Sequence, residues 1–177
     1  MKNFLTAITF FITIMLSAQN GWIQRTSLPA DGRHRATGCG IGNKGYLGLG
    51  HVNGTTASIN YADWWEYDPA SESWTQKASY PTVNYGAVFY VADGKAFVGG
   101  GTFLNGEFYA YSPVTNTWTS INPCPASPGD KGAMSVNGKG YVLAGLFYEY
   151  DPATGLWTPK TSPPVTFGTW CIAFSTA

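Results

Sequence analysis

The sequence predicts an all-β protein assembled from repeated four-stranded antiparallel sheets. An eight-residue phrase occurs three times, as YDPASESW from Tyr67, YSPVTNTW from Tyr111 and YDPATGLW from Tyr150. The composition agrees with this, because aromatic residues make up 16% of the chain, charged residues only 11%, and glycines number 22. Such a balance is typical of short strands joined by tight turns rather than of helices.

A second set of residues recurs at a fixed position of each repeat, and we call such a set a column; it runs in phase with this phrase. The segments KGYLGLG, KAFVGGG and KGYVLAG begin at Lys44, Lys95 and Lys139, and each has a glycine six residues after its lysine. Tryptophans form a third column, at Trp22, Trp74, Trp118 and Trp157, with spacings of 52, 44 and 39 residues. Columns that stay in phase over such a period indicate repeated units that stack on one another.

Each unit is predicted to contain four strands. The first strands span residues 36–41, 87–91 and 132–136, and the second strands span 46–50, 97–101 and 141–145. The turns between them hold Gly42-Asn43, Asp93-Gly94 and Asn137-Gly138, dipeptides that accept the positive φ angles of tight hairpins. The third strand alternates aromatic with small or charged residues, as in Trp65-Glu66-Tyr67, and the repeated phrase then turns into a short fourth strand at the tryptophan.

A four-stranded sheet buries both of its faces only when it stacks between neighbouring sheets, and radial stacking gives a β-propeller. On these residues the chain resembles kelch repeats, through the glycine-ended second strand, the Tyr-Asp-Pro turn and the tryptophan seven residues after the tyrosine. The residues that form this pattern are Gly50, Tyr67, Asp68, Pro69, Trp74, Gly101, Tyr111, Pro113, Trp118, Gly145, Tyr150, Asp151, Pro152 and Trp157. Blade two departs from it with Ser112 in the aspartate position, and blade three with Leu143 and Ala144 where paired glycines usually stand.

The repeats predict three complete blades, at approximately residues 35–78, 86–122 and 132–161. Single strands are expected on either side, an outer strand from Trp22 and the inner strand of a further blade at residues 166–175. Since closed propellers have four to eight blades, we expect this kelch-type propeller to be part of a larger one. If the chain is complete, its exposed sheet edges would favour self-association.

The first residues predict export. Lys2 precedes a 15-residue apolar run from Phe4 to Ala18, which is typical of a cleaved signal peptide spanning residues 1–18. The propeller would then occupy residues 19–177 of a secreted or periplasmic protein that has no membrane span after cleavage. An uncleaved membrane anchor is the alternative.

Charge and cysteine content exclude several classes of protein. Removal of Lys2 leaves nine basic side chains against ten acidic ones, so no basic surface is expected to attract nucleic acid. Of the three cysteines, Cys39 and Cys171 fall on inner strands and are expected to be small buried residues, with a disulfide as the alternative. Neither CxxC spacing nor a histidine cluster predicts a zinc site, and we expect no cofactor.

The variable loops are expected to share one face, because the loops between strands two and three and the loops that join blades emerge on the same side. Binding residues belong on that face. The candidates are Arg33, His34, Arg35, His51, Asn53, Tyr61, Asn84 and Tyr85. The two arginines either grip a ligand carboxylate or pair with acids such as Asp31 and Asp63. The two histidines are either solvated loop residues or partners in metal binding or proton transfer.

The repeated acidic residues have a structural interpretation. Asp68 and Asp151 precede proline in a turn, where a carboxylate accepts local backbone hydrogen bonds. Glu66 and Glu149 occupy a fixed repeat position, so we do not expect them to act as a catalytic pair.

These observations predict an exported, non-enzymatic binding module that recognises a protein or a glycan through the loop-rich face. The kelch resemblance also implies two alternatives. One is a sugar-acid enzyme similar to N-acetylneuraminate epimerase, in which Arg33, His34 and Arg35 would act. The other is a copper enzyme similar to galactose oxidase, for which His34 and His51 lack the surrounding motif.

Overall fold

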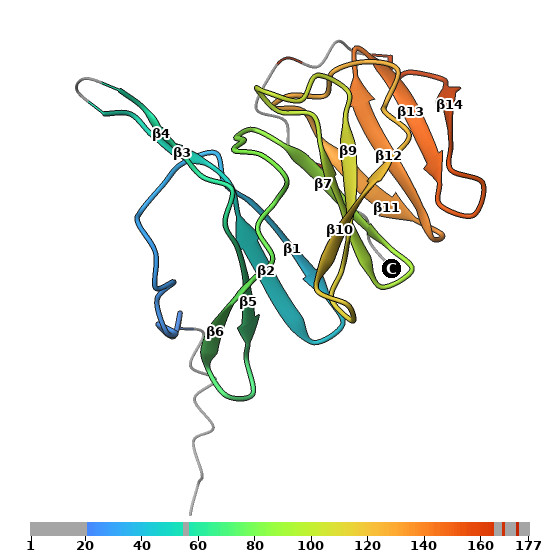
Figure 1. Cartoon of the computed structure of the whole chain (residues 1–177). Helices are drawn as coiled ribbons and strands as arrows, with labels where there is room; N and C mark the ends of the chain where they lie inside the picture. Colours follow the sequence, from blue (N-terminus) through green and yellow to red (C-terminus); the bar gives the residue numbers. More distant parts are fainter. Residues whose placement is uncertain (1–20, 55–56, 165–167, 169–172, 174–177) are drawn as a thin grey trace, which may run out of the picture.

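The computed structural model describes residues 21–54, 57–164, 168 and 173, and in these the chain forms three four-stranded antiparallel sheets that lie side by side (Figure 1). The predicted all-β fold is confirmed, and no helix of the described residues is long and apolar enough to cross a membrane.

The blades follow one another along the chain. Blade one contains β1 (Thr37–Ile41), β2 (Lys44–Gly48), β5 (Trp64–Asp68) and β6 (Ser73–Lys77). Blade two contains β7 (Val88–Ala92), β8 (Lys95–Gly99), β9 (Phe108–Ser112) and β10 (Thr117–Ile121). Blade three contains β11 (Ala133–Val136), β12 (Lys139–Ala144), β13 (Leu146–Asp151) and β14 (Leu156–Lys160).

The repeated phrase forms the turn between the third and fourth strands. In blade one the Asp68 carboxylate accepts a hydrogen bond from the Ala70 amide at 2.9 Å, and in blade three Asp151 accepts one from Ala153 at the same distance. Lys44 and Lys139, the lysines of the second column, make ion pairs with these two aspartates. The two carboxylates therefore fix a turn and a neighbouring strand, which is the structural role that their position before proline predicts.

The core lies between blades in two clusters. Tyr46 and Trp64 of blade one pack against Tyr111 of blade two, while Phe97 of blade two packs against Tyr150 of blade three. The ring centroids of Tyr46 and Tyr111 are 5.7 Å apart, as are those of Phe97 and Tyr150. The two inter-blade contacts thus have the same geometry, and burial of aromatic surface between sheets is the main force that holds them together.

The tryptophan column joins each blade to the segment before it. The indole N–H of Trp74 donates to the carbonyl of Thr26, that of Trp118 to Ala78, and that of Trp157 to Asn122, at 2.8–2.9 Å. Each acceptor stands four residues after the preceding tryptophan of the column. The recurring tryptophan is therefore a contact between repeats as well as a core residue.

The glycine column lies just after the second strand of each blade, which ends one or two residues earlier than predicted, and it has a conformation that other residues rarely adopt. Gly50, Gly101 and Gly145 have φ values of 93°, 83° and 81°. A side chain at Gly50 would also meet the backbone carbonyl of His34 at 2.9 Å. Both the dihedral angle and the space require glycine at this position.

Two parts of the fold differ from the sequence prediction. The outer strand expected at Trp22 is wrong, because residues 21–29 form no strand and the Trp22 side chain is 105% exposed. A strand needs a hydrogen-bonded neighbour, and within the described part of the chain this segment is held by a hydrogen bond from the Trp74 indole and by an ion pair between Arg25 and Glu72. The loop expected at 51–62 contains a two-stranded ribbon, β3 (His51–Val52) with β4 (Ile59–Asn60), that projects from blade one (Figure 1).

Two predicted segments fall on residues that the structure does not describe. They are the signal peptide at 1–18 and the inner strand at 166–175, of which only Gly168 and Ala173 are described. Cys171 lies there too, whereas Cys39 is partly buried and Cys124 is buried. Burial raises the pKa of the Cys39 thiol to about 12, so this side chain acts as a small apolar residue.

Candidate functional site

The loop-rich face is built by backbone hydrogen bonds that join loops of neighbouring blades. The amide of Gly50 donates to the carbonyl of Asn84 at 2.9 Å, and the amide of Asn84 donates to Tyr61 at 3.1 Å. Gly86 donates to the carbonyl of Arg35, and its own carbonyl accepts from Asp130, at 3.1 and 2.8 Å. These bonds link the loops that precede the inner strands to one another and to the loop between β2 and β5, so the face is an ordered surface supported by the blades.

Arg33 lies at the centre of a first cluster on this face. Its guanidinium forms an ion pair with Asp63, donates to the carbonyl of Leu49 at 3.3 Å, and lies 3.7 Å from the centre of the Tyr61 ring. The Tyr61 hydroxyl in turn donates to Asp31 at 3.2 Å. Burial and this hydrogen bond raise the pKa of Tyr61. With its side chain only 4% exposed, Arg33 is occupied inside the protein.

Arg35 belongs to a second cluster, which spans three blades. Its guanidinium makes a two-pronged ion pair with Asp130, which is 95 residues away in the sequence, and it lies 4.3 Å from the centre of the Tyr85 ring. The pair is half-buried, and a two-pronged contact is the strongest geometry that arginine offers a carboxylate. This guanidinium therefore ties the loops of blades one, two and three together.

The two histidines lie in this second cluster and stack with Tyr85. The ring centroids of His34 and His51 are 3.9 Å apart, and those of His51 and Tyr85 are 3.8 Å apart with nearly parallel planes. Burial lowers the pKa of His51, and the neighbouring His34 and Arg35 act in the same direction. His51 is thus held neutral in a column of rings, with His34 on its exposed side.

The remaining predicted residues have different environments. Asn84 is fully buried, and its amide donates to the Gly100 carbonyl at 2.7 Å while its oxygen accepts from the amides of Tyr85 and Thr102 at 2.9 and 3.1 Å. These bonds give Asn84 the role of a loop support. Asn53 is exposed beyond β3, in the projecting ribbon.

The structure brings six of the eight predicted residues into these two clusters and adds residues that sequence reasoning missed. Asp130 was missed because nothing in a single sequence connects it to Arg35 across 95 positions. Phe103 was also missed; the residue is 49% exposed, and its ring meets that of Tyr85 edge-on with 5.6 Å between the ring centroids. Ile59 of the β3–β4 ribbon is 55% exposed, and Val83, in the loop before β7, is 39% exposed.

The chemistry of this face follows from the ion pairs that its two arginines make. The arginines point into Asp63 and Asp130 rather than to solvent. Among the described residues there is no group of three or more His, Cys, Asp or Glu side chains that could hold a metal ion. The exposed residues of this face include apolar side chains such as Phe103, Ile59 and Val83 beside polar ones such as His34 and Asn53, while its two arginines are neutralised by ion pairs.

Comparison with known proteins agrees with this architecture. No family model matches the chain. An F-box/kelch-repeat protein of Arabidopsis thaliana is 34% identical over 95 residues, which are 51% of this chain and 27% of that protein. The solved structure of YjhT matches with a TM-score of 0.71 at 18% identity, and the match covers 82% of this chain and 57% of the YjhT chain. The chain thus spans about a quarter of the curated relative and little more than half of the structural one.

The stacked four-stranded sheets define a β-propeller architecture, of which the described residues form three consecutive blades. The glycine, tyrosine and tryptophan columns resemble those of kelch repeats, the plant F-box/kelch-repeat protein is similar over 95 residues, and YjhT shares the fold.

Proposed function

We propose that the chain is an exported protein-interaction module that binds its partner through the loop-rich face. The observation that supports this most is the combination of internal charge pairing with exposed apolar side chains. Phe103 and Val83 are exposed in loops of that face and Ile59 is exposed in the β3–β4 ribbon, while the guanidinium groups of Arg33 and Arg35 are already paired. Exposed aromatic and aliphatic side chains on a rigid base are typical anchors of protein interfaces.

The same pairing favours a protein partner over a small anionic ligand or a glycan acid. To bind a ligand carboxylate, Arg33 or Arg35 would have to give up Asp63 or Asp130 and leave a half-buried carboxylate without its partner. Breaking such a pair is strongly unfavourable. A protein partner needs no such exchange, because it can cover the apolar side chains and leave the ion pairs intact.

The test is partner capture by crosslinking in the exported fraction of the native cells, followed by mass spectrometry. Phe103→Asp is expected to remove captured proteins that the unchanged chain retains. Val114→Asp is the matched control, because Val114 is 93% exposed in the turn between β9 and β10, on the opposite face. Equal capture by both variants, or binding only to immobilised glycans, would overturn the proposal.

Export is proposed from the first 18 residues and has its own test. The mass of the protein recovered from the periplasm or medium should correspond to a chain that begins at Gln19. Recovery of the unprocessed chain in the membrane fraction would instead support an uncleaved anchor.

A further inference from the structure

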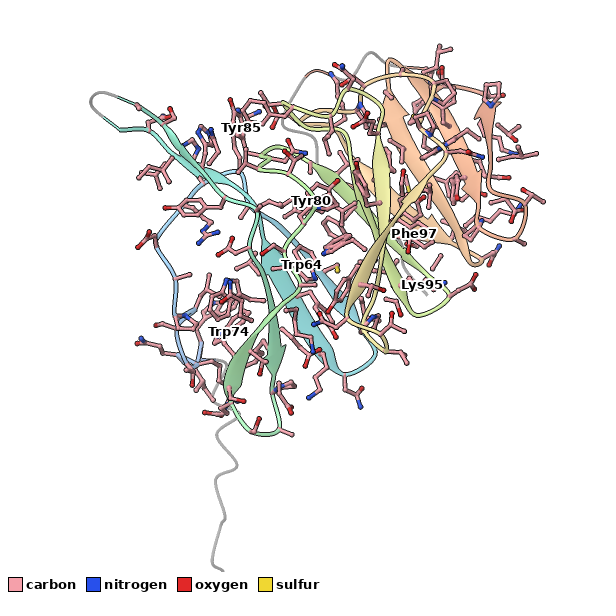
Figure 2. All side chains as sticks on the ribbon, in the orientation of Figure 1. Trp64, Trp74, Tyr80, Tyr85, Lys95 and Phe97 are labelled. Atoms are coloured by element: carbon pink, nitrogen blue, oxygen red, sulfur yellow. The ribbon has the colours of Figure 1, made fainter. Side chains whose placement is uncertain are left out.

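A second site lies away from the loop-rich face, between blades two and three. A cavity of about 420 Å³ opens there, lined by side chains of β8, β9 and β10 and by Tyr150 and Pro152 of blade three. Lys95 and Phe97 stand on its β8 wall, at the end of blade two opposite to Tyr85 (Figure 2). The cavity therefore shares no residue with the two clusters described above.

The internal repeat explains why this cavity exists. Blades one and three have a polar group at the corresponding place: Glu149 accepts from Tyr141 at 2.7 Å and pairs with Lys139 and Lys160 at 3.0 and 2.9 Å. In blade one, Glu66 accepts from Tyr46 at 2.5 Å and pairs with Lys77 at 3.5 Å. The glutamate therefore fills this position in both blades and neutralises the lysines around it.

Blade two replaces every partner in that group except the lysine that begins the second strand, Lys95. The strand register places Phe97 opposite Ala110, and Ala110 opposite Thr119, just as Tyr141 faces Glu149 and Glu149 faces Thr158. Phe97, Ala110 and Ile121 thus stand where blade three has Tyr141, Glu149 and Lys160. Ser112 stands in place of the turn aspartate, so Lys95 has lost both carboxylates that its counterpart Lys139 contacts.

Within the described residues Lys95 makes no ion pair, whereas Lys44 and Lys139 do. The one acid on the cavity wall is Asp93, two residues away, and it does not bridge to Lys95. Hydroxyl groups of Ser112, Thr117 and Thr119 line the same cavity. The result is a cavity with an apolar floor, hydroxyl-bearing walls and one ammonium group at its edge.

We propose that this cavity binds a small carboxylate with a short apolar body. The ligand's carboxylate takes the place of the missing glutamate beside Lys95, where an ammonium and neighbouring hydroxyls donate to it. Its apolar part covers Phe97, Ala110 and Ile121, which line the cavity where a charged pair stands in blade three. The volume lies within the range of small-molecule sites.

Isothermal titration calorimetry of the full chain with sodium hexanoate tests this, with hexanamide as the neutral probe of the same shape. Hexanoate is expected to bind saturably and hexanamide about tenfold more weakly or not at all. Lys95→Met should weaken hexanoate binding about tenfold or more, while Lys44→Met, at the same position of blade one, should leave it unchanged. Asp93→Asn should strengthen hexanoate binding, since it removes a carboxylate at the edge of the cavity that repels the carboxylate of the ligand.

Ala110→Glu supplies the carboxylate from within the chain and should abolish hexanoate binding. Lys95 is exposed, so its substitution leaves the fold intact and keeps the test decisive if Ala110→Glu does not fold. Absence of saturable binding to the unchanged chain, or equal affinity in Lys95→Met, would overturn the proposal. Neither result would bear on partner capture by Phe103, because the two sites share no residue.

Discussion

Blade two and blade three have the same four strands in the same register, yet they use different chemistry at the centre of the sheet. Blade three has Glu149 hydrogen-bonded to Tyr141 and paired with two lysines, while blade two has Ala110 beside Phe97. The aromatic contacts across the two blade interfaces nevertheless match, at 5.7 Å. The stacking geometry is thus set by the aromatic columns, and the position between them is free to be a polar network or a cavity.

A second difference concerns the size of facing residues. Cys39 of blade one and Tyr90 of blade two occupy equivalent inner-strand positions, opposite Tyr46 and Phe97 respectively. The residue after the repeated lysine of the next blade is Ala96 in blade two, after Cys39, and Gly140 in blade three, after Tyr90. An alanine thus stands in the blade after the small Cys39, whereas a glycine lies against the larger Tyr90 ring.

The largest expected effect comes from Gly140→Ala. The added methyl group would overlap the Tyr90 ring, which is fully buried and stacked on Phe97. We expect a loss of about 2–3 kcal/mol in the free energy of unfolding, the upper part of the range of about 1–3 kcal/mol that is typical of overpacked cores. Urea denaturation measures it.

Gly45→Ala is the matched control for that substitution. Gly45 is the equivalent position in blade one, where a methyl group would meet only the Tyr67 Cβ at 3.7 Å, an ordinary contact. Its cost should stay below about 0.5 kcal/mol. Similar losses for the two variants would contradict the size pairing between blades.

A smaller loss is expected from Trp118→Phe. This change removes the 2.9 Å hydrogen bond to the Ala78 carbonyl and part of the contact with Tyr80, whose ring centroid lies 4.8 Å away. About 1–2 kcal/mol of stability should be lost. Trp22→Phe, at an exposed position of the same column, should change thermal unfolding little; a comparable loss there would show that the inter-blade bond is unimportant.

These contacts also show which features a sequence can predict. The three blades and the turn role of Asp68 and Asp151 were predictable because the glycine, tyrosine and tryptophan columns repeat in phase. The β3–β4 ribbon was not, because its strands are two residues long and belong to no column. At the missing outer strand, Trp22 itself is exposed, yet Thr26 still accepts the hydrogen bond from Trp74, so this contact between repeats forms without strand pairing.

The candidate site was less predictable than the fold. Asp63 was foreseen as a partner for Arg33, but the partner of Arg35 comes from a different blade. The cavity beside Lys95 was hidden for another reason. Its signal is the joint replacement of Glu, Tyr and Lys in blade two, which becomes visible only when strand register places these positions next to one another.

The next prediction concerns pH and the polar network of blade three. Hydrogen bonds from Tyr141 and the two lysines lower the pKa of Glu149 from its ordinary value near 4.5 to about 2. Because the folded-state pKa is depressed, the stability it contributes is complete above pH 4.5 and is lost as the pH falls toward 2. Glu149→Gln should therefore cost about 1 kcal/mol at neutral pH and flatten the fall in stability over that acid range.

Glu107→Gln is the control for this measurement, because Glu107 is exposed and its side chain makes no hydrogen bond or ion pair with the described residues. Its stability profile should follow that of the unchanged chain between pH 7 and about 2. If Glu149→Gln and Glu107→Gln have the same acid profile, the network in blade three does not stabilise the fold.

The central claim is that the polar network and the cavity are alternatives at one position of the blade. A double-mutant cycle with Ala110→Glu and Lys95→Met tests it most directly, with urea unfolding of all four chains at neutral pH. A glutamate at residue 110 should pair with Lys95 as Glu149 pairs with Lys139, giving a favourable coupling of about 0.5–1 kcal/mol. A coupling of zero, with Ala110→Glu equally destabilising whether or not Lys95 is present, would contradict the account.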